Sequence, residues 1–513
     1  MPRLSQSFHV IVVGAGGSGL AAAVRAAQLG VRVLLLEKGP EPGGTTGIAV
    51  GSFTSNRTRH QSRAGIEDRW QDHAEDAGRF APTWIEAKNH HELRRSFLER
   101  SAATLEWLEE LGLRFNGPHP EPPNRVARMH NVIPGAKAYI RQLTKHFQSL
   151  GGTLLTKARV LRLTETGDRI SGVEFEQDAR LTSVSAERGV VLAAGDYANA
   201  PDLITRFRGE AFAEVEGINP QAHGDGHRLA ESVGAHLVNM DVTYGPELRF
   251  VAPDRSALLG NWFLQRPLPT ALASLLAKHC PPSVVRHLAK RLVLTWQHPE
   301  DALFEDGTIL VNRQGERFCN ELKSPDREIA ITAQPNKDAF LLLDEALADR
   351  YSRWPHFIST APRIAYAYLE DYRKHRKDIT LEFDRTGAFP VTCPVDLSRL
   401  FQTVDGYNQA LRAGLADSLG RSKGRRMLTG NRWILMGPAK AYFTTTEGGA
   451  AINSSFQVLR EDGTPIRGLY AVGQNGLGGQ ILWGHGLHIA WALTSGRLVG
   501  EVLAGHVDSK PRS

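Results

Sequence analysis

A short unit near the N-terminus constrains the fold of this chain more than any other feature. His9 to Val13 is a continuous run of mostly β-branched apolar residues, and 31–36 is a second apolar run. Between them stand Gly14-Ala-Gly16-Gly-Ser-Gly19 and an alanine-rich stretch that ends at Leu29. Apolar runs without alternation are typical of parallel strands that are buried on both faces. The pattern therefore predicts strand, tight turn, helix and parallel strand, which is the beginning of an α/β domain.

The spacing of the three glycines indicates what this turn binds. The first glycine permits the tight turn, the second lets the backbone approach a pyrophosphate, and the third allows close packing of helix and strand. The helix N-terminus then faces the phosphates. Glu37 follows the second apolar run, where a carboxylate can bond ribose hydroxyls. These residues predict a dinucleotide site, and by themselves they fit NAD as well as FAD.

The rest of the chain changes character twice. With 513 residues it is long enough for two or three domains. After a predicted helix, Ala138 to Gly151, and strand, Thr153 to Thr164, the part between about 230 and 430 is rich in Pro, Trp and Arg. Glycine-rich strand and helix patterns return from Tyr442 onward. We therefore expect a discontinuous dinucleotide-binding domain, 1–228 and 437–513, with a Rossmann-like parallel sheet and helices, interrupted by an α+β capping domain, 229–436.

Composition and charge disfavour several classes of protein. The 61 basic and 55 acidic residues are interspersed and leave a formal charge of +6, so we expect no nucleic-acid partner. Three cysteines, Cys280, Cys319 and Cys393, form no CxxC pair, which argues against a disulfide framework or a metal site. No uncharged apolar run approaches the ~20 residues of a membrane span, and Met1 to Phe8 is too short and polar for a signal peptide. These features predict a cytoplasmic protein without a metal.

Segments spread along the whole chain resemble one known group of proteins. They are similar to signatures of the fumarate reductase and 3-ketosteroid dehydrogenase superfamily of FAD-dependent enzymes, and they stand in the same order as in that superfamily. Besides the first glycine-rich turn, the segments are Glu37–Thr46, Gly152–Val173, Val190–Tyr197, Asn219–Met240, Ile309–Glu321, Thr446–Asn453, Gly468–Gln474 and Gly484–Arg497. The chain is therefore identified as a member of this superfamily.

The resemblance implies that FAD lies across the top of the parallel sheet and is enclosed by the inserted domain. The helix after the Gly484–Gly486 turn would present its N–H groups to the flavin N1/O2 edge, and Gln474 would bond the ribityl chain. The stretch Gly43–Val50 lacks the histidine of relatives with covalent flavin, so noncovalent FAD is expected. The residues expected to bind the cofactor are Gly14, Gly16, Gly17, Ser18, Gly19, Glu37, Lys38, Gly44, Thr45, Thr46, Gly47, Val160, Ala194, Gly195, Asp225, Gly473, Gln474, Leu487, His488 and Ile489.

The substrate side departs from these relatives. Fumarate reductases place an arginine where this chain has Leu322-Lys-Ser-Pro325, and a histidine where it has Thr445. Their second substrate-binding arginine is also replaced, around Trp483 to His485. The steroid dehydrogenases fit better, since their Y-P-G-x-G-(A)-T aligns without gaps on Leu482 to His488. The glycine that polarises a 3-ketone in the steroid dehydrogenases is retained there as Gly486, whereas their tyrosine is Leu482 here. The three replaced fumarate-reductase positions disfavour a dicarboxylate substrate.

Three residues near these positions are candidates for the chemistry. Histidine titrates near neutrality, so His485 could exchange a proton, or it could only bond the flavin or cap the helix. Tyr442 could polarise a carbonyl or take a proton, or it could be a buried core tyrosine. Gly486 would polarise a ketone through its N–H group. His488, in contrast, is expected to be structural or to contact the flavin.

These observations predict an FAD-dependent oxidoreductase that acts on a C–C bond adjacent to a carbonyl group. The preferred reaction is dehydrogenation of a cyclic ketone or ketosteroid-like substrate. The alternative is an enoate- or fumarate-type reductase that reduces an activated C=C bond. A flavin hydroxylase, a respiratory-complex subunit and a non-catalytic FAD-binding protein are less favoured, the last because a cap domain normally encloses a substrate. The expected partners are an apolar, carbonyl-bearing small molecule and a separate electron acceptor, without a membrane span.

Overall fold

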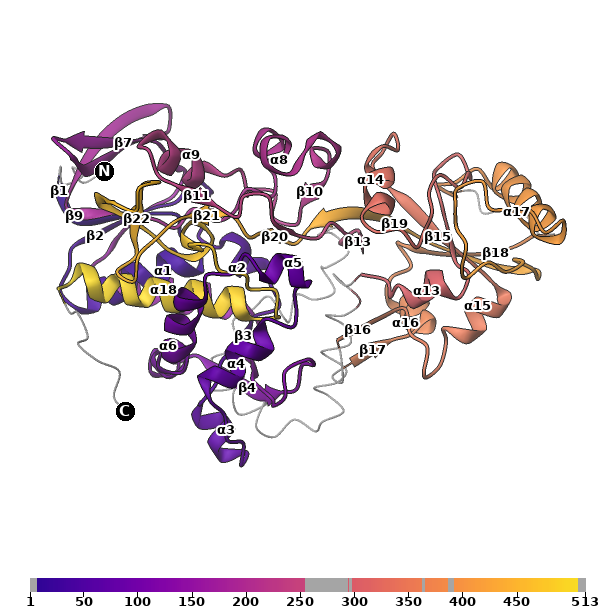
Figure 1. Ribbon diagram of the computed structural model, residues 1–513, viewed down its shortest axis with the longest axis horizontal. Coiled ribbons are helices and arrows are strands. Elements are labelled where there is room, and N and C mark those ends of the chain that lie inside the picture. The colour runs from indigo at the N-terminus through magenta and orange to yellow at the C-terminus, as the bar shows by residue number, and fades with distance from the viewer. Residues whose placement is uncertain (1–6, 254–293, 295–297, 362–364, 386–391, 506–513) are drawn as a thin grey trace. The chain divides into compact units, whose positions relative to one another are not determined.

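The computed structural model describes residues 7–253, 294, 298–361, 365–385 and 392–505. The chain divides into two units, and each is described by itself (Figure 1). The first unit consists of Met1–Glu210, Gly217–Tyr244 and Thr445–Ser513, and the second of Ala211–Glu216 and Gly245–Thr444. The first unit is therefore discontinuous in sequence. The domain limits expected from the sequence, at 228/229 and 436/437, stay a prediction.

An eight-stranded sheet lies at the centre of the first unit, and its middle strands are parallel. β1 pairs in parallel with β2 and with β9, and β9 also pairs in parallel with β23. The strands run in the order β22 (Gln457–Leu459), β23 (Pro465–Ala471), β8 (Arg169–Gln177), β9 (Arg180–Leu192), β1 (Ser7–Val13), β2 (Val33–Leu36) and β6 (Thr153–Leu155), with β7 (Ala158–Thr166) paired to β8. The parallel arrangement that the glycine-rich unit predicts is present.

One strand prediction is wrong in detail. The run Thr153 to Thr164, expected as a single strand, forms β6 and β7, which pair with β2 and β8 respectively. The chain turns at Lys157, whose φ of 53° is left-handed. The N–H groups of Lys157 and Ala158 donate to the carbonyls of Gly39 and Glu37, each at 2.8 Å. The apolar pattern of the sequence does not predict these two hydrogen bonds, and so it does not predict the break between β6 and β7.

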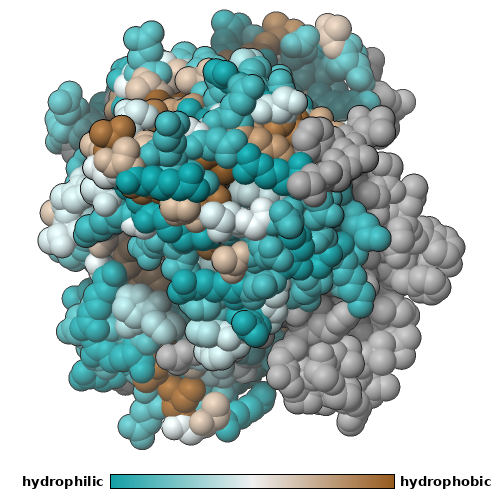
Figure 2. Space-filling model, turned by 90° about the vertical axis from the view of Figure 1, so that its right-hand side faces the viewer, coloured by the Kyte–Doolittle hydropathy of each residue, from teal (hydrophilic) through white to brown (hydrophobic). Residues whose placement is uncertain are grey.

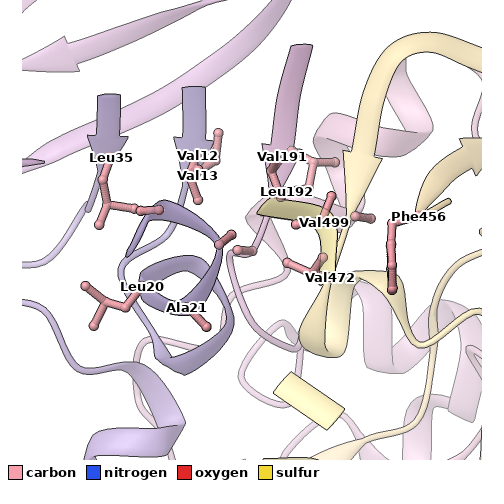
Figure 3. Close-up of a cluster of buried hydrophobic side chains, with 14 of the residues drawn as sticks. Val12, Val13, Leu20, Ala21, Leu35, Val191, Leu192, Phe456, Val472 and Val499 are labelled. Atoms are coloured by element: carbon pink, nitrogen blue, oxygen red, sulfur yellow. The ribbon is translucent and has the colours of Figure 1, made fainter. Parts of the chain in front are cut away.

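Buried aliphatic side chains hold the sheet and its helices together. Val12 and Val13 of β1, Leu35 of β2 and Val191 of β9 lie in one cluster, with Leu20 among them (Figure 3). Val12, Leu20, Leu35 and Val191 have no exposed surface. The apolar runs of the sequence are therefore buried on both faces, as parallel strands require.

Two helices of the first unit pack unusually closely. α1 (Gly17–Gln28) and α18 (Leu487–Leu503) lie side by side, although they come from opposite ends of the chain (Figure 1). A Cβ at Gly496 would overlap the carbonyl oxygen of Ser18 and lie 2.9 Å from Cβ of Ala21. A Cβ at Gly500 would lie 2.9 Å from the carbonyl oxygen of Ala22. Small residues on both helices therefore set the spacing between them.

Shorter elements complete the first unit. Its other helices are α2 (Gly44–Ile48), α3 (Arg59–Arg63), α4 (Trp70–Ala77), α5 (Thr83–Glu86), α6 (His91–Glu110), α7 (Lys137–Ser149), α8 (Pro201–Arg208), α9 (Asp225–Ser232) and the 3₁₀ helix η3 (Gly473–Gly476). Its small sheets are β3 (Ser52–Thr54), β5 (Met129–Ile133) and β4 (Arg114–His119); β11 (Leu237–Val238) with β21 (Gly449–Ala450); and β12 (Thr243–Tyr244) with β20 (Thr445–Thr446). The 3₁₀ helix η1 (Glu210–Phe212) and β10 (Glu216–Gly217) lie at the limits of the two units.

The second unit is built around one long strand. β19 (Arg432–Phe443) pairs antiparallel with β13 (Glu247–Phe250), β15 (Ala339–Asp344) and β18 (Thr380–Asp384) and also neighbours β10 in the same sheet. Trp433 of β19 and Leu341 of β15 are fully buried. The other strands are β14 (Ile309–Val311) and the pair β16 (Ser359–Ala361) and β17 (Ala365–Ala367). The helices are α13 (Ala302–Glu305), α14 (Asp326–Thr332), α15 (Glu345–Arg350), α16 (Leu369–His375) and α17 (Leu397–Arg412). The predicted fold class, a Rossmann-like α/β sheet interrupted by an α+β part, is confirmed.

The surface and the helix lengths bear on membranes. On the face drawn in Figure 2 hydrophilic residues predominate, and hydrophobic residues stand in small separate groups. No helix within the described ranges is both long enough and apolar enough to cross a bilayer.

The close packing of α1 and α18 gives a stability prediction. We expect Gly496→Ala to lower the free energy of unfolding by about 1–3 kcal/mol, because the new methyl group must displace α1. Gly406→Ala in α17 is the matched control, since Gly406 is a helical glycine with no atom within 4 Å of its Cβ position. It should raise stability by up to about 1 kcal/mol. Urea unfolding followed by circular dichroism measures both, and equal effects would contradict the packing argument.

Candidate active site

In the first glycine-rich turn two of the three glycines have no space for a Cβ atom, and one has space for it. Gly14 has a φ of +105°, and a Cβ there would lie 2.9 Å from Cα of Ala194. A Cβ at Gly19 would overlap the carbonyl oxygen of Gly14. At Gly16, however, no atom lies nearer than 3.9 Å to the Cβ position, and no side chain caps α1. The packing of the protein therefore requires glycine at the first and third positions. At the second position there is free space in front of the N–H groups at the N-terminus of α1, and such a site favours binding of a phosphate group.

Glu37 is held in place by the backbone around it. Its carboxylate accepts hydrogen bonds from the N–H groups of Ala15 at 2.8 Å and Gly39 at 2.7 Å. A carboxylate has about four acceptor positions, so two bonds leave capacity for ribose hydroxyls. The side chain expected to bind ribose is thus fixed at the end of β2, beside the glycine-rich turn.

The next predicted residues, Lys38 and Asp225, bond to each other. Nζ of Lys38 lies 2.6 Å from the carboxylate of Asp225 and 2.7 Å from the carbonyl oxygen of Gln221. Arg159 adds a second contact to Asp225, at 3.1 Å. Burial raises the pKa of Asp225, but the bonds and charges of Lys38 and Arg159 outweigh it and hold this pKa below its usual range. These two predicted residues therefore form an ion pair that joins Lys38 to the first turn of α9, where Asp225 lies.

The second glycine-rich segment packs on the first. The N–H of Gly43 donates to the carbonyl oxygen of Ala15 at 3.1 Å, and a Cβ at Gly17 would lie 2.6 Å from Oγ1 of Thr46. Oγ1 of Thr45 accepts a hydrogen bond from Asn219 at 2.9 Å. Gly44 and Gly47 belong to the short helix α2 of this segment. The structure thus brings Gly14 to Gly19 and Gly44 to Gly47 together.

Asn475 connects the glycine-rich segments from the middle and the end of the chain. Its side chain accepts from the N–H of Ala194 at 2.6 Å and donates to the carbonyl oxygen of Gly195 at 2.9 Å. It also donates to Nδ1 of His227 at 3.2 Å, and Nε2 of His227 donates to the carbonyl oxygen of Gly448 at 3.1 Å. Burial lowers the pKa of His227 to about 4, so the ring is neutral and keeps this donor and acceptor pattern. Sequence analysis missed both residues, although Asn475 stands beside the predicted Gly473 and Gln474.

Gln474 ends a buried chain of hydrogen bonds. Its side chain donates to Oγ1 of Thr445 at 2.7 Å and to the carbonyl oxygen of Thr446 at 2.8 Å. Oγ1 of Thr445 in turn donates to the carboxylate of Asp196 at 2.8 Å. Burial raises the pKa of Asp196, which is only 2% exposed. The position where fumarate reductases carry a histidine thus holds a threonine that joins Asp196 to Gln474.

The turn before α18 carries His485 on a fixed backbone. Thr54 of β3 donates through Oγ1 to the carbonyl oxygen of His485 at 2.6 Å. Gly486 has a φ of +80°, and a Cβ there would lie 2.8 Å from Oγ1 of Thr54, so this position accepts only glycine. The carboxylate of Glu121 lies 3.0 Å from the backbone nitrogen of His485 and 2.5 Å from its Nδ1. Sequence analysis missed Glu121, which no motif marks.

His488 has a different carboxylate partner. Its Nε2 lies 2.8 Å from Glu447, a residue with no exposed surface that also accepts from the N–H of Leu482 at 3.2 Å. Leu487 is buried and Ile489 is partly buried in the same helix. Val160, also expected near the cofactor, is 8% exposed and lies in β7, two residues after the Ala158 that bonds Glu37. These residues are placed in the first unit with the glycine-rich segments.

Tyr442 belongs to the second unit, in β19, where it pairs with Glu247 of β13. Burial raises the pKa of Tyr442 to about 12, with a smaller contribution from Glu216. The phenol is therefore neutral at neutral pH and can donate a hydrogen bond. Within the ranges that the structure describes, no group of three or more His, Cys, Asp or Glu side chains is arranged to hold a metal ion.

Comparison with known protein families decides the cofactor. A model described as FAD binding domain matches residues 9–259 and 277–481. The chain belongs to this FAD binding family. The open position at Gly16, the uncapped start of α1 and the spare acceptor capacity of Glu37 fit the pyrophosphate and ribose of FAD. The cofactor predicted from the sequence, FAD, is confirmed.

Curated relatives include reductases. The chain is 25% identical to an NADH:fumarate oxidoreductase of Klebsiella pneumoniae, over 98% of this chain but only 48% of that protein. It therefore spans about half the length of that relative. A vinyl phenol reductase of Lactiplantibacillus plantarum is 24% identical over 96% of both chains.

Solved structures of the same fold include both branches of the predicted superfamily. A flavocytochrome c3 fumarate reductase in an open conformation has a TM-score of 0.73 and 23% identity, over 98% of this chain and 79% of that one. A 3-ketosteroid-Δ4-(5α)-dehydrogenase of Rhodococcus jostii has a TM-score of 0.58 and 21% identity, over 98% of both chains. The predicted membership of a superfamily of FAD-dependent oxidoreductases is confirmed.

The unequal space at the three glycines gives a binding prediction. We expect Gly16→Ala to fold with unchanged stability, because the site admits a methyl group and the φ of −79° suits alanine. Its affinity for FAD should fall at least about tenfold, since the methyl group occupies the path of the pyrophosphate. Titration of the apoprotein with FAD, followed by flavin fluorescence, measures the affinity.

Gly19→Ala is the contrasting variant. Its methyl group would overlap the backbone of Gly14, so unfolding in urea should occur at lower denaturant concentration even without FAD. Wild-type FAD affinity in Gly16→Ala would contradict the assignment of this turn to the pyrophosphate.

Proposed function

We propose that the protein dehydrogenates a C–C bond adjacent to the carbonyl group of a cyclic ketone or ketosteroid-like substrate. The observation that carries this proposal is the turn Gly484–Leu487, where a histidine and an uncapped helix N-terminus occur together in an FAD-binding chain. Such a turn can exchange a proton and stabilise negative charge on a carbonyl oxygen. When bound, FAD supplies the hydride chemistry, which no side chain of the protein can provide.

We further propose that the first unit holds FAD noncovalently through its glycine-rich segments. Gly14 to Gly19 would face the pyrophosphate, and Glu37 would accept from the ribose. The other residues proposed to contact or to shape the cofactor site are Lys38, Gly44, Thr45, Thr46, Gly47, Val160, Ala194, Gly195, Asp225, Gly473, Gln474, Leu487, His488 and Ile489. Contacts among Ala194, Gly195 and Asn475, and between Gln474 and Thr445, support this proposal, because they fix the segments to one another.

The start of α18 supplies electrostatic stabilisation in this proposal. Gly486 is its N-cap and no side chain caps this 17-residue helix. The N–H of Leu487 bonds the carbonyl oxygen of Gly484 at 3.2 Å, so the N–H groups proposed to polarise a carbonyl are those of Gly486, His488 and Ile489. A carbonyl oxygen that gains negative charge as the α carbon loses a proton is stabilised most by donors that are already in place. Gly486 meets this condition, because Thr54 fixes the turn and leaves no space for a side chain.

His485 is the proposed proton carrier at the α carbon. Its side chain is 66% exposed, whereas the partner carboxylate of Glu121 is only 8% exposed. The imidazole ring is therefore held at Nδ1 by Glu121, while most of its side-chain surface is exposed to solvent. Tyr442, as a neutral phenol, is the second candidate to donate a hydrogen bond to the substrate carbonyl.

The surroundings of the turn support an apolar substrate. Ala81, Ile85, Val242 and Ile481 are buried in one cluster with Trp483 packed against it. The ring of Trp483 lies 5.1 Å from that of Tyr244. Arg94, which bonds the carbonyl oxygen of Ile481, is already paired with Glu86 at 2.7 Å. Its charge is thus matched within the protein, which disfavours a dicarboxylate at this position.

A second candidate function is reduction of an activated C=C bond. The names of the curated relatives favour it, because one acts on fumarate and another on vinyl phenols. The same residues serve either direction, since a proton donor in reduction is the proton acceptor in dehydrogenation. The vinyl phenol reductase matches over 96% of both chains and is named for an aromatic substrate, which supports an aromatic rather than a dicarboxylate substrate for this chain too.

An anaerobic flavin spectrum distinguishes these candidates. We expect saturated cyclic ketones to bleach the oxidised flavin band near ~450 nm, because hydride then reaches the flavin. His485→Ala should slow this half-reaction by about 10²–10⁴-fold, the usual contribution of a general acid or base. Tyr442→Phe should have a smaller effect if the tyrosine only donates a hydrogen bond.

The controls separate failure of the chemistry from failure of the fold. His60→Ala removes another histidine bound to a carboxylate, Glu109 at 2.8 Å, and should leave the rate unchanged. Reoxidation of chemically reduced enzyme by an enone, without bleaching by any ketone, would establish the reductase instead. No reaction in either direction would refute both candidates.

A further inference from the structure

The contact between Glu121 and His485 is more specific than an ordinary surface ion pair. One oxygen of Glu121 lies 3.0 Å from the backbone nitrogen of His485 and 2.5 Å from Nδ1 of its ring. Both groups belong to the first unit, and 364 positions of sequence separate them. A single buried oxygen thus bonds the main chain and the side chain of one residue.

The geometry identifies which ring nitrogen carries the proton. The Glu121 oxygen already accepts a hydrogen bond from a backbone N–H, so it acts as an acceptor. A carboxylate has no proton to donate, so against a carboxylate Nδ1 is the donor in the second contact. Since neutral imidazole carries one proton, Nδ1–H leaves Nε2 as the basic nitrogen.

The pair is fixed from both sides. Thr54 and β3 hold the backbone of His485, as described above. On the other side, Asn124 donates through its backbone N–H to the carbonyl oxygen of Glu121 at 2.9 Å, and its side chain lies 3.5 Å from the second carboxylate oxygen. Glu121 itself is only 7% exposed. An arrangement with this little freedom positions a ring rather than merely neutralising it.

We propose that Glu121 is the positioning residue of His485: it sets the Nδ1–H tautomer, holds the ring and directs Nε2 to the reacting carbon. This inference rests on the proposed function of the site. In dehydrogenation the α carbon of the substrate loses a proton to Nε2 and its β carbon loses a hydride to FAD, which leaves a C=C bond. The carboxylate of Glu121 keeps its contact with Nδ1 and stabilises the imidazolium that forms. In reduction the same transfers run in reverse.

The test combines ring-nitrogen NMR with the rate of the flavin half-reaction. In holoenzyme with ¹⁵N-labelled histidine, the His485 signals, assigned with His485→Ala, should show Nδ1–H in the neutral form. Glu121→Ala should abolish this preference and slow the half-reaction at least about tenfold, with substrate affinity little changed. Glu121→Gln keeps an acceptor oxygen, so it should retain Nδ1–H and have an intermediate rate. Because it preserves the shape of the side chain, it also serves if Glu121→Ala does not fold.

Glu109→Ala is the matched control, since it removes the carboxylate partner of His60. It should change neither the His485 signals nor the rate. If both Glu121 variants behave like this control, the positioning role is refuted. If His485→Ala leaves the rate unchanged while Glu121→Ala still alters the tautomer, the proposed function of His485 fails instead, and the two failures are thereby distinguished.

Discussion

The close approach of backbone to backbone at the first glycine-rich turn is the constraint on which the rest of the first unit depends. The carbonyl oxygen of Gly14 occupies the place where any residue other than glycine at position 19 would have its Cβ. The start of α1 can therefore pack this closely on the end of β1 only because position 19 is a glycine. α18 in turn packs closely on α1 through Gly496 and Gly500. Because Gly486 is the N-cap of α18, the position of the candidate catalytic turn follows from glycine contacts at Gly496 and Gly500, further along the same helix.

Much of this arrangement could be predicted from the sequence because its causes are local. A glycine spacing and two unbroken apolar runs are enough to predict β1, α1 and β2, and the structure contains all three. The break between β6 and β7 could not be predicted in this way. It depends on bonds from Lys157 and Ala158 to carbonyls more than a hundred positions earlier, and the local pattern continues as a strand.

The residues of the candidate site also fall into those that a local sequence pattern predicts and those that depend on distant partners. Predicted residues such as Gly16, Glu37 and Gln474 lie in motifs, where a residue type is tied to a spacing. Asn475 and Glu121 lie outside the segments that carry the resemblance, and His227 lies inside one of them at a position to which no role was assigned. Each bonds a partner at least 221 positions away. A lone Glu between prolines carries no periodic or compositional signal, so only the fold reveals that it meets His485.

This division explains why the cofactor is easier to assign than the substrate. In the proposed site FAD is held largely by backbone groups at positions without side chains, and a glycine that has no space for a Cβ can hardly be replaced. A substrate is selected by side chains on a scaffold that tolerates their exchange, so fold likeness carries little information about it. The positions at which the sequence departs from fumarate reductases, among them Thr445 and the stretch Trp483 to His485, lie on the expected substrate side, whereas the segments expected to bind the cofactor are retained. In the proposed function the proton carrier of this turn is His485, which a buried carboxylate contacts without disturbing the glycines beside it.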